Sequence, residues 1–196
     1  MTTAERIDAL WRAHAEVKQR EENARASAWM GTPQYIAGVP VSELTLEKYE
    51  LLKANGSPFV CGGDPTDVLA WQAIWILSDE FKVGDTLARD NFFTKHAEAQ
   101  IMGPLLDYFE AAFADSDLGG GKPSGIETYA APTAHFVHMF AESYGWTVPQ
   151  IMATPIGQLF QLARCIIKSK DNRAHFGSKS MEISAQIVRI LNERAE

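Results

Sequence analysis

The chain has 196 residues and a formal net charge of −7, with 46% hydrophobic and 22% charged residues. This is the composition of an ordinary globular protein, and it excludes intrinsic disorder as the main state. A chain of this length buries roughly 70% of its extended surface, so its stability needs neither a metal nor a disulfide. It contains no apolar run of about 18 residues, which argues against membrane spans and a membrane partner.

The charges are unevenly distributed along the chain. Residues 1–30 carry five charges of each sign and residues 164–196 are net basic, so the acidic excess lies in residues 31–163. A strongly acidic middle region repels phosphate backbones. The charge distribution therefore argues against nucleic acid as a partner.

The cysteines and the N-terminal segment indicate the compartment. Cys61 and Cys165 cannot form a disulfide framework, and we expect both to be buried thiols in a reducing environment. The N-terminal segment is charged from Glu5 onward and lacks the apolar stretch of a signal peptide. The sequence therefore predicts a cytoplasmic protein.

Residues 3–29 are predicted to form one long helix, because Ile7, Leu10, Trp11 and Val17 recur at helical spacing. After Val17 nearly every residue is polar or small. The second half of the helix therefore has little to bury and either projects into solvent or needs a partner. This apolar stripe is too short for a sustained coiled-coil seam.

Residues 31–114 are predicted to form a helical core with a short extended segment over 34–41. Asp64 is expected to cap the second helix of this region, which is apolar on most sides and should lie in the core. Gly103-Pro104 is expected to interrupt the third. The predicted helices are 44–54, 65–80 and 86–114.

Residues 115–125 are rich in glycine and are predicted to form a flexible linker. Residues 126–196 are predicted to be helical again, with helices starting near Pro132, Thr147 and Thr154 and a last one capped by Ser178 or Ser180. Whether this part packs with 31–114 as one domain is left open. The fold class predicted is mainly α, a multi-helix bundle with a long N-terminal helix (1–30) and a flexible Gly-rich linker.

The best candidate for a metal site is the set His135, His138 and Glu142. Offsets of three and seven residues place these side chains on one helix face, where they could bind zinc or iron. The same spacing also arises in an ordinary amphipathic helix, and we favour a partly buried pair of neutral histidines. We expect no bound metal, no cofactor and no catalytic residue.

Arg164, Lys168, Lys170 and Arg173, with Lys179 beyond them, form a loose basic stripe near a predicted helix end. The simplest interpretation is favourable placement of positive charge at a helix C-terminus. The alternative is contact with a phosphate or another anion.

Aromatic and apolar residues outside the predicted core are candidates for binding a protein partner, since tryptophan in particular is enriched at interface hot spots. Trp29 ends a polar helix and either folds back onto the body or anchors a partner. The candidate partner-binding residues are Trp11, Val17, Trp29, Tyr35 and Trp146.

Two stretches resemble a known family. The first comprises Pro40–Leu52, Ser57–Pro65 and Leu69–Leu77, and the second comprises Phe140–Ile151 and Pro155–Leu162. Their arrangement resembles small helical proteins encoded in the tail module of tailed bacteriophages and prophages, especially tail assembly chaperone-like proteins. The resemblance spans residues 40–77 and 140–162, under a third of the chain.

This resemblance implies a non-enzymatic role in the cytoplasm of a host cell. A protein of this kind would hold an aggregation-prone helical tail component, such as the tape-measure protein, until the tail tube assembles, and it could form a homo-oligomer. The alternative within the same biology is a structural protein, a connector or tail component, that is retained in the virion. Two further hypotheses are a metal-dependent enzyme using His135, His138 and Glu142 and a nucleic-acid binder using residues 164–179.

Overall fold

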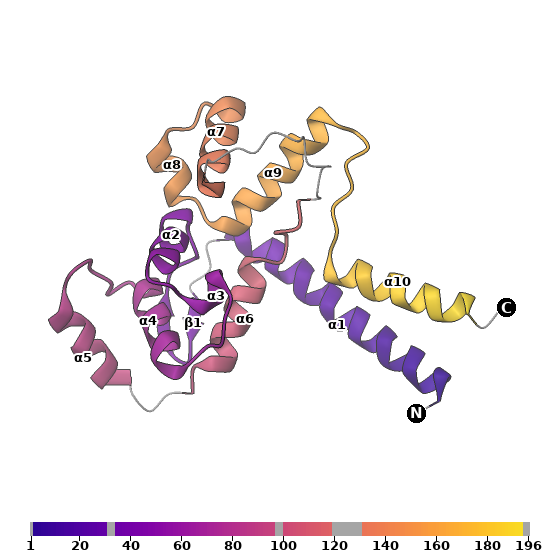
Figure 1. Cartoon of the computed structure of the whole chain (residues 1–196), viewed down its shortest axis with the longest axis horizontal. Coiled ribbons are helices and arrows are strands. Elements are labelled where there is room, and N and C mark those ends of the chain that lie inside the picture. Colours follow the sequence, from indigo (N-terminus) through magenta and orange to yellow (C-terminus); the bar gives the residue numbers. More distant parts are fainter. Residues whose placement is uncertain (1, 31–33, 97–99, 119–130, 194–196) are drawn as a thin grey trace.

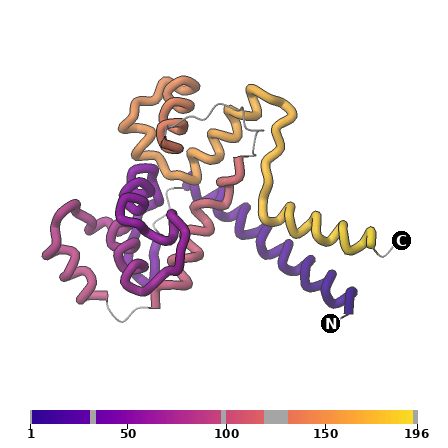
Figure 2. The backbone as a smooth tube through the Cα atoms, in the orientation of Figure 1, coloured from indigo at the N-terminus to yellow at the C-terminus, as the bar shows by residue number. Residues whose placement is uncertain are grey.

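The computed structural model describes residues 2–30, 34–96, 100–118 and 131–193, and this part of the chain is mainly helical, as predicted. Its ten helices form a body and a projecting arm (Figure 1). The arm consists of α1 (Thr3–Met30) and α10 (Lys179–Asn192). The first residue of α1 and the last residue of α10 both lie toward the arm's tip, so the two helices run antiparallel (Figure 2).

The predicted extended segment is a β-hairpin. β1 (Gln34–Ile36) pairs with β2 (Val39–Val41) in antiparallel register, with Ile36 opposite Val39. Ala37 (φ 50°) and Gly38 (φ 82°) form the two-residue turn, and both have the positive φ that a type I′ turn requires. The hairpin buries Ile36 and Val39 in the core.

The lower layer of the body in Figure 1 begins with three helices that follow the hairpin. Thr66, and not the expected Asp64, is the N-cap of the third, because its hydroxyl accepts a hydrogen bond from the Leu69 N–H at 3.4 Å. That helix contributes Ala70, Ala73, Ile74 and Leu77 to the core, as predicted. The three helices are α2 (Leu46–Ala54), α3 (Pro58–Cys61) and α4 (Asp67–Leu77).

Two separate helices, α5 (Thr86–His96) and α6 (Met102–Ala112), occupy the region where one interrupted helix was expected. Gly103 and Pro104 do not cause the interruption, because they lie in the first turn of α6. A proline is tolerated there since its missing N–H would have no intrahelical acceptor. The residues between the two helices, 97–99, lie outside the described part of the chain.

The upper layer consists of α7 (Pro132–Tyr144), α8 (Val148–Ala153) and α9 (Ile156–Lys170), which begin close to the predicted positions. Backbone hydrogen bonds join the layers, because Ile156 N–H donates to the Leu44 carbonyl at 2.7 Å and Leu46 N–H donates to the Thr154 carbonyl at 3.2 Å. Side chains from both layers belong to one core cluster. Its fully buried members include Leu52, Ile74, Leu105, Phe140, Ile151 and Leu159.

Helix α1 departs from the sequence prediction in its second half. This half was expected to have little to bury, but it packs against α6 and α9. A β-carbon added at Gly157 would lie 3.5 Å from that of Ala28, so the two helices approach closely. The first half of α1 is the part that projects, and there it packs along α10.

Candidate functional site

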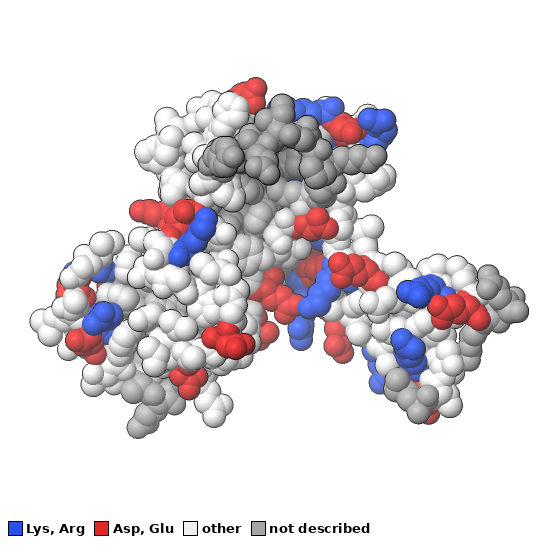
Figure 3. All heavy atoms as spheres, in the orientation of Figure 1, with Lys and Arg blue, Asp and Glu red and all other residues white. Residues whose placement is uncertain are grey.

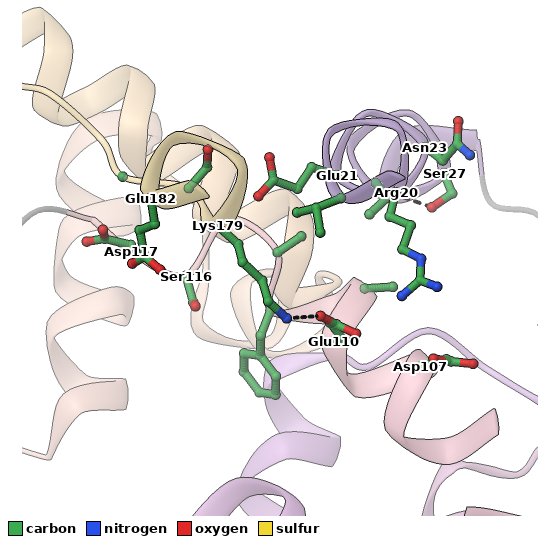
Figure 4. A pocket seen from close by; sticks show the side chains of 17 residues that line it. Arg20, Glu21, Asn23, Ser27, Asp107, Glu110, Ser116, Asp117, Lys179 and Glu182 are labelled. Atoms are coloured by element: carbon green, nitrogen blue, oxygen red, sulfur yellow. Dashed lines mark hydrogen bonds and ion pairs between the residues drawn. The ribbon is translucent and has the colours of Figure 1, made fainter. Parts of the chain in front are cut away.

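A cleft of about 750 Å³ lies where the arm meets the body, between α1, α6 and the first turn of α10 (Figure 4). Val17, Ala24, Ala111 and Phe113 give it an apolar lining. Polar and charged side chains line most of the rest, and of the charged ones five are acidic and two are basic. The charged residues are Arg20, Glu21, Asp107, Glu110, Asp117, Lys179 and Glu182.

An ion pair crosses this cleft. Lys179 at the start of α10 donates to the Glu110 carboxylate on α6 at 2.7 Å, and the interaction is drawn as a dashed line in Figure 4. The hydrogen bond from Lys179 is the main cause that lowers the pKa of Glu110, and the charges of Lys179 and Arg20 lower it further. Glu110 is therefore ionised at neutral pH, and the cleft keeps its acidic excess.

A buried carboxylate fixes α10 against α1. Glu21 is only 7% exposed, and it accepts hydrogen bonds from the Ser180 backbone N–H at 3.2 Å and from the Ser180 hydroxyl at 2.7 Å. Ser178 caps the same helix by accepting from Met181 N–H at 3.3 Å. A negative charge at a helix N-terminus also interacts favourably with the helix dipole. Glu21 therefore sets where α10 begins along α1.

A second polar cluster fixes the base of the arm. Asp115 is 4% exposed, and its Oδ1 pairs with Arg25 Nε on α1 at 2.9 Å and with Arg164 on α9 at 3.2 Å. Arg164 also donates to the Asp117 and Gly177 carbonyls. The predicted flexible linker 115–125 thus begins with a residue held by two ion pairs, and residues 119–125 lie outside the described part of the chain.

An aromatic pocket of about 460 Å³ lies on a neighbouring side of α6. Phe59 stacks on Phe109 with ring centroids 5.2 Å apart, and Phe109 stacks on Phe113 at 6.4 Å. Phe113 and Glu110 line both this pocket and the cleft, so the two cavities adjoin along α6.

The five candidate partner-binding residues do not form one patch. Val17 lines the cleft, and Trp11 is 49% exposed on the arm. Trp29 donates its indole N–H to Gln161 on α9 while 52% of the residue stays exposed. Tyr35 is exposed on the hairpin, and Trp146 is half-buried against Phe140 in the upper layer.

The predicted histidine pair is not partly buried. His135, His138 and Glu142 are all exposed on α7, because that helix turns Phe136 and Phe140 toward the core. Glu142 lies 3.8 Å from Lys170. Within the described ranges, no group of three or more His, Cys, Asp or Glu side chains is arranged to hold a metal ion.

Each residue of the basic stripe contacts a nearby acceptor. Arg164 belongs to the cluster at the base of the arm. Lys168 donates to the Ala174 carbonyl at 3.3 Å, Lys170 pairs with Glu142 at 3.8 Å, and Arg173 pairs with Asp171 at 3.2 Å. Binding an anion would compete with these contacts, so the anion site stays a prediction without geometric support.

Both cysteines are exposed, contrary to expectation. Cys61 is the last residue of the short helix α3, and its thiol lies 3.8 Å from the Lys53 carbonyl. Cys165 lies on α9 between the buried residues Ala163 and Ile166, on the face turned to solvent. Both cysteines have apolar neighbours in the sequence. Such neighbours do not determine which side of a helix other elements cover, so they did not predict the exposure of these thiols.

A partly buried polar cluster closes the C-terminus of α4. The Lys48 ammonium donates a hydrogen bond to the Leu77 carbonyl at 2.7 Å, and burial lowers the pKa of this lysine. Tyr108 donates to the Ser42 carbonyl at 2.9 Å, and burial raises the pKa of its phenol. Burial also raises the pKa of Glu43. Lys48 satisfies a helix-terminal carbonyl, so we assign it a structural role.

Comparisons of the chain with protein-family models, with curated proteins and with solved structures found no match. In the part of the chain that the structure describes, no helix combines the length and apolar character needed to cross a membrane.

Sequence analysis did not identify Glu21, Asp115 or Ser180 as site residues. One signal was available for Glu21. Positions 7, 10, 14, 17, 21, 24 and 28 follow alternating steps of three and four residues, and Glu21 occupies a place on this seam. The prediction ended the stripe at Val17 because it counted only large apolar residues.

Proposed function

We propose that this protein is a non-enzymatic assembly factor of tailed bacteriophages that binds a helical tail component, such as the tape-measure protein, in the cleft between α1, α6 and α10. The observation that carries the proposal is the form of the cleft, which combines an apolar lining with an acidic excess. The chain's resemblance to tail assembly chaperone-like proteins, described above, supports the choice of partner.

The volume and charge of the cleft suit a helical, basic partner. One turn of a helix about 10 Å wide and 5.4 Å long occupies on the order of 400 Å³, so the cleft's volume is comparable to about two turns. Val17 and Phe113 offer apolar contacts for the partner's apolar stripe. Asp107 and Glu182 favour a partner with lysine or arginine beside that stripe.

The test is co-expression with a tape-measure protein encoded in the same genome. The wild-type chain is expected to keep that protein soluble and to co-purify with it. Ala111→Arg places a long cationic side chain in the cleft from an exposed position on α6, and it should abolish both effects. Ala141→Arg makes the same change at an exposed position on α7 and should leave both effects intact.

Two results contradict the proposal. In one, the wild-type chain does not keep the tape-measure protein soluble. In the other, the Ala111→Arg variant keeps the tape-measure protein soluble and co-purifies with it as well as the Ala141→Arg variant does. Mass spectrometry of purified virions separates an assembly factor, which is absent from the mature particle, from a structural component that remains in it.

A further inference from the structure

The last helix of the chain carries two apolar stripes. Ser180, Ile183, Ile187 and Ile190 follow steps of three and four residues along the side of α10 that meets Glu21 and α1. Met181, Ser184, Val188 and Leu191 repeat the same steps one residue later. Each residue advances an α-helix by about 100°, so the second stripe lies beside the first, about a quarter-turn away from the side that contacts α1.

The second stripe is exposed. Met181 is 57% exposed, Val188 is 54% exposed and Leu191 is 44% exposed, whereas Ile187 of the first stripe is 1% exposed. A soluble helix that packs against one neighbour needs only one apolar stripe. Two adjacent stripes are the pattern of a helix that packs against two neighbours, as in a four-helix bundle.

Helix α1 presents an exposed tryptophan on the same side of the arm. Ile7, Leu10 and Val17 lie on the seam with α10, and Trp11 lies about a quarter-turn from this seam in the direction of helical advance. Val188 is displaced from the α10 seam by a similar rotation. Because the helices run antiparallel, these two rotations bring Trp11 and Val188 to one face of the arm.

This outer face lies opposite the cleft. Arg20, Ala24 and Ser27 of α1 line the cleft, and they lie on the other side of the helix from Trp11. The outer face comprises Trp11, Met181, Val188 and Leu191. Binding at this face therefore leaves the cleft open and does not depend on the function proposed for it.

The arm has little core of its own. Among its apolar residues, Ile7 and Ile187 are the buried ones within the described part of α1 and α10. Two helices provide a single seam, and most helical stability in proteins comes from packing an apolar face against tertiary neighbours. A second pair of helices on the outer face would supply those neighbours.

Charge favours a second copy of this arm as the neighbour. Residues 1–30 carry five charges of each sign, and residues 179–193 carry two of each, whereas the whole chain carries −7. Figure 3 shows basic and acidic residues interspersed over the arm. Two copies can therefore meet through their arms without net repulsion at the contact, while the acidic excess stays on the bodies.

We propose that the outer face binds the same face of a second copy, so that two arms pack antiparallel into a four-helix bundle. This orientation is symmetric and places the two acidic bodies at opposite ends. The face is about 20 Å long over the 14 residues of α10 and about 20 Å wide over two helices. A dimer would bury on the order of 1,000 Å², at the lower end of specific interfaces, and should dissociate in the micromolar range.

Sedimentation equilibrium of the full-length protein from about 1 to about 200 µM tests this proposal. The wild-type mass is expected to rise from 21.7 kDa toward twice that value as concentration increases. Val188→Asp places a charge in the centre of the outer face and should weaken dimerisation at least tenfold. Val68→Asp makes the same change on α4, where Val68 is 68% exposed, and should leave the dimer unchanged.

Trp11→Ala is the second variant, because it acts from the other helix and adds no charge. Far-UV circular dichroism of each variant checks that its helices form. A wild-type chain that stays monomeric throughout the range overturns the proposal. So does a dimer that neither Trp11→Ala nor Val188→Asp weakens, since that dimer would use another surface.

Discussion

Glu21 and Ser180, which are 159 residues apart in sequence, form a buried contact in which one carboxylate accepts both the backbone N–H and the hydroxyl of the serine. The contact joins the middle of α1 to the first turn of α10. It holds one wall of the cleft, and it sets the register of the two helices that present the outer face of the arm.

Replacing Glu21 by alanine should destabilise the protein. The substitution leaves two donors of Ser180 without their acceptor in a buried setting, and hydrogen bonds to charged groups contribute about 1.5–3 kcal/mol. We expect a loss of about 2 kcal/mol in the free energy of unfolding, measured by urea denaturation. Glu22→Ala, at an exposed neighbour 3.9 Å from Lys18, should cost less than about 0.5 kcal/mol. If the two variants lose the same free energy of unfolding, the buried contact between Glu21 and Ser180 does not stabilise the protein as described.

Arg164→Lys should destabilise the folded protein, although the substitution keeps the positive charge. The Arg164 guanidinium pairs with Asp115 at 3.2 Å and donates to three backbone carbonyls, and a lysine ammonium cannot reach all four groups. Because Asp115 is buried, weakening its pairing should cost about 3 kcal/mol.

Arg173→Lys is the matched control for this substitution. The side chain of Arg173 is 90% exposed and pairs with Asp171 at the surface, so thermal and urea unfolding should change little. If Arg164→Lys and Arg173→Lys have the same free energy of unfolding, the cluster at the base of the arm does not stabilise the fold as described.

Glu43→Gln should stabilise the protein at neutral pH. Burial raises the pKa of Glu43 above its ordinary value of 4.5, and its Oε1 is buried without a hydrogen-bond partner in the described residues. The unfolded chain therefore releases this proton more readily than the folded chain. The contribution of Glu43 to stability is present below pH 4.5 and is lost as the pH rises through the folded pKa.

The stability difference between Glu43→Gln and wild type should accordingly grow from about pH 4 to neutrality, as followed by urea unfolding at several pH values. Glu16→Gln, the same substitution at an exposed position on α1, is measured alongside as the control. A Glu43 variant that is less stable than wild type at pH 7 would contradict the assignment of an energetic cost to this carboxylate.

Ala37→Asn should stabilise the hairpin. Ala37 has a φ of 50° at the first turn position, and a left-handed conformation costs an ordinary L-residue about 1 kcal/mol. Asparagine adopts this conformation more readily and is favoured before glycine in type I′ turns. We expect a rise of up to about 1 kcal/mol in the free energy of unfolding, whereas Ala141→Asn within α7 should lower it, since asparagine has the weaker helix propensity.

Local chemistry made most helix positions predictable. Pro132 begins α7 as expected from the sequence, and Ser178, one of the two serines considered, caps α10. These signals act within one or two turns, so they can be identified without knowing the fold. At the start of α4 the sequence predicted Asp64 as the cap, but Thr66 is the N-cap and its hydroxyl accepts a hydrogen bond from the Leu69 N–H.

The candidate site was far less predictable. Val17 was identified as a partner-binding residue and lines the cleft, but the opposite walls come from α6 and α10, about 90 and 160 residues away. An anion contact was the alternative interpretation for Arg164, and the anion that it meets is the carboxylate of Asp115 in the same chain. No spacing within a single helix could indicate either pairing.

The sequence alone determined the mainly helical fold, the ends of most helices and the excess of acidic charge in the body, because these depend on composition and on interactions between near neighbours. Tertiary structure alone decided that the two terminal helices pack together, that Glu21 is buried against Ser180, and that one stripe of α10 is covered while the next is exposed. Those outcomes depend on which surfaces meet across long separations in the chain, and helical periodicity specifies the surfaces but not their partners.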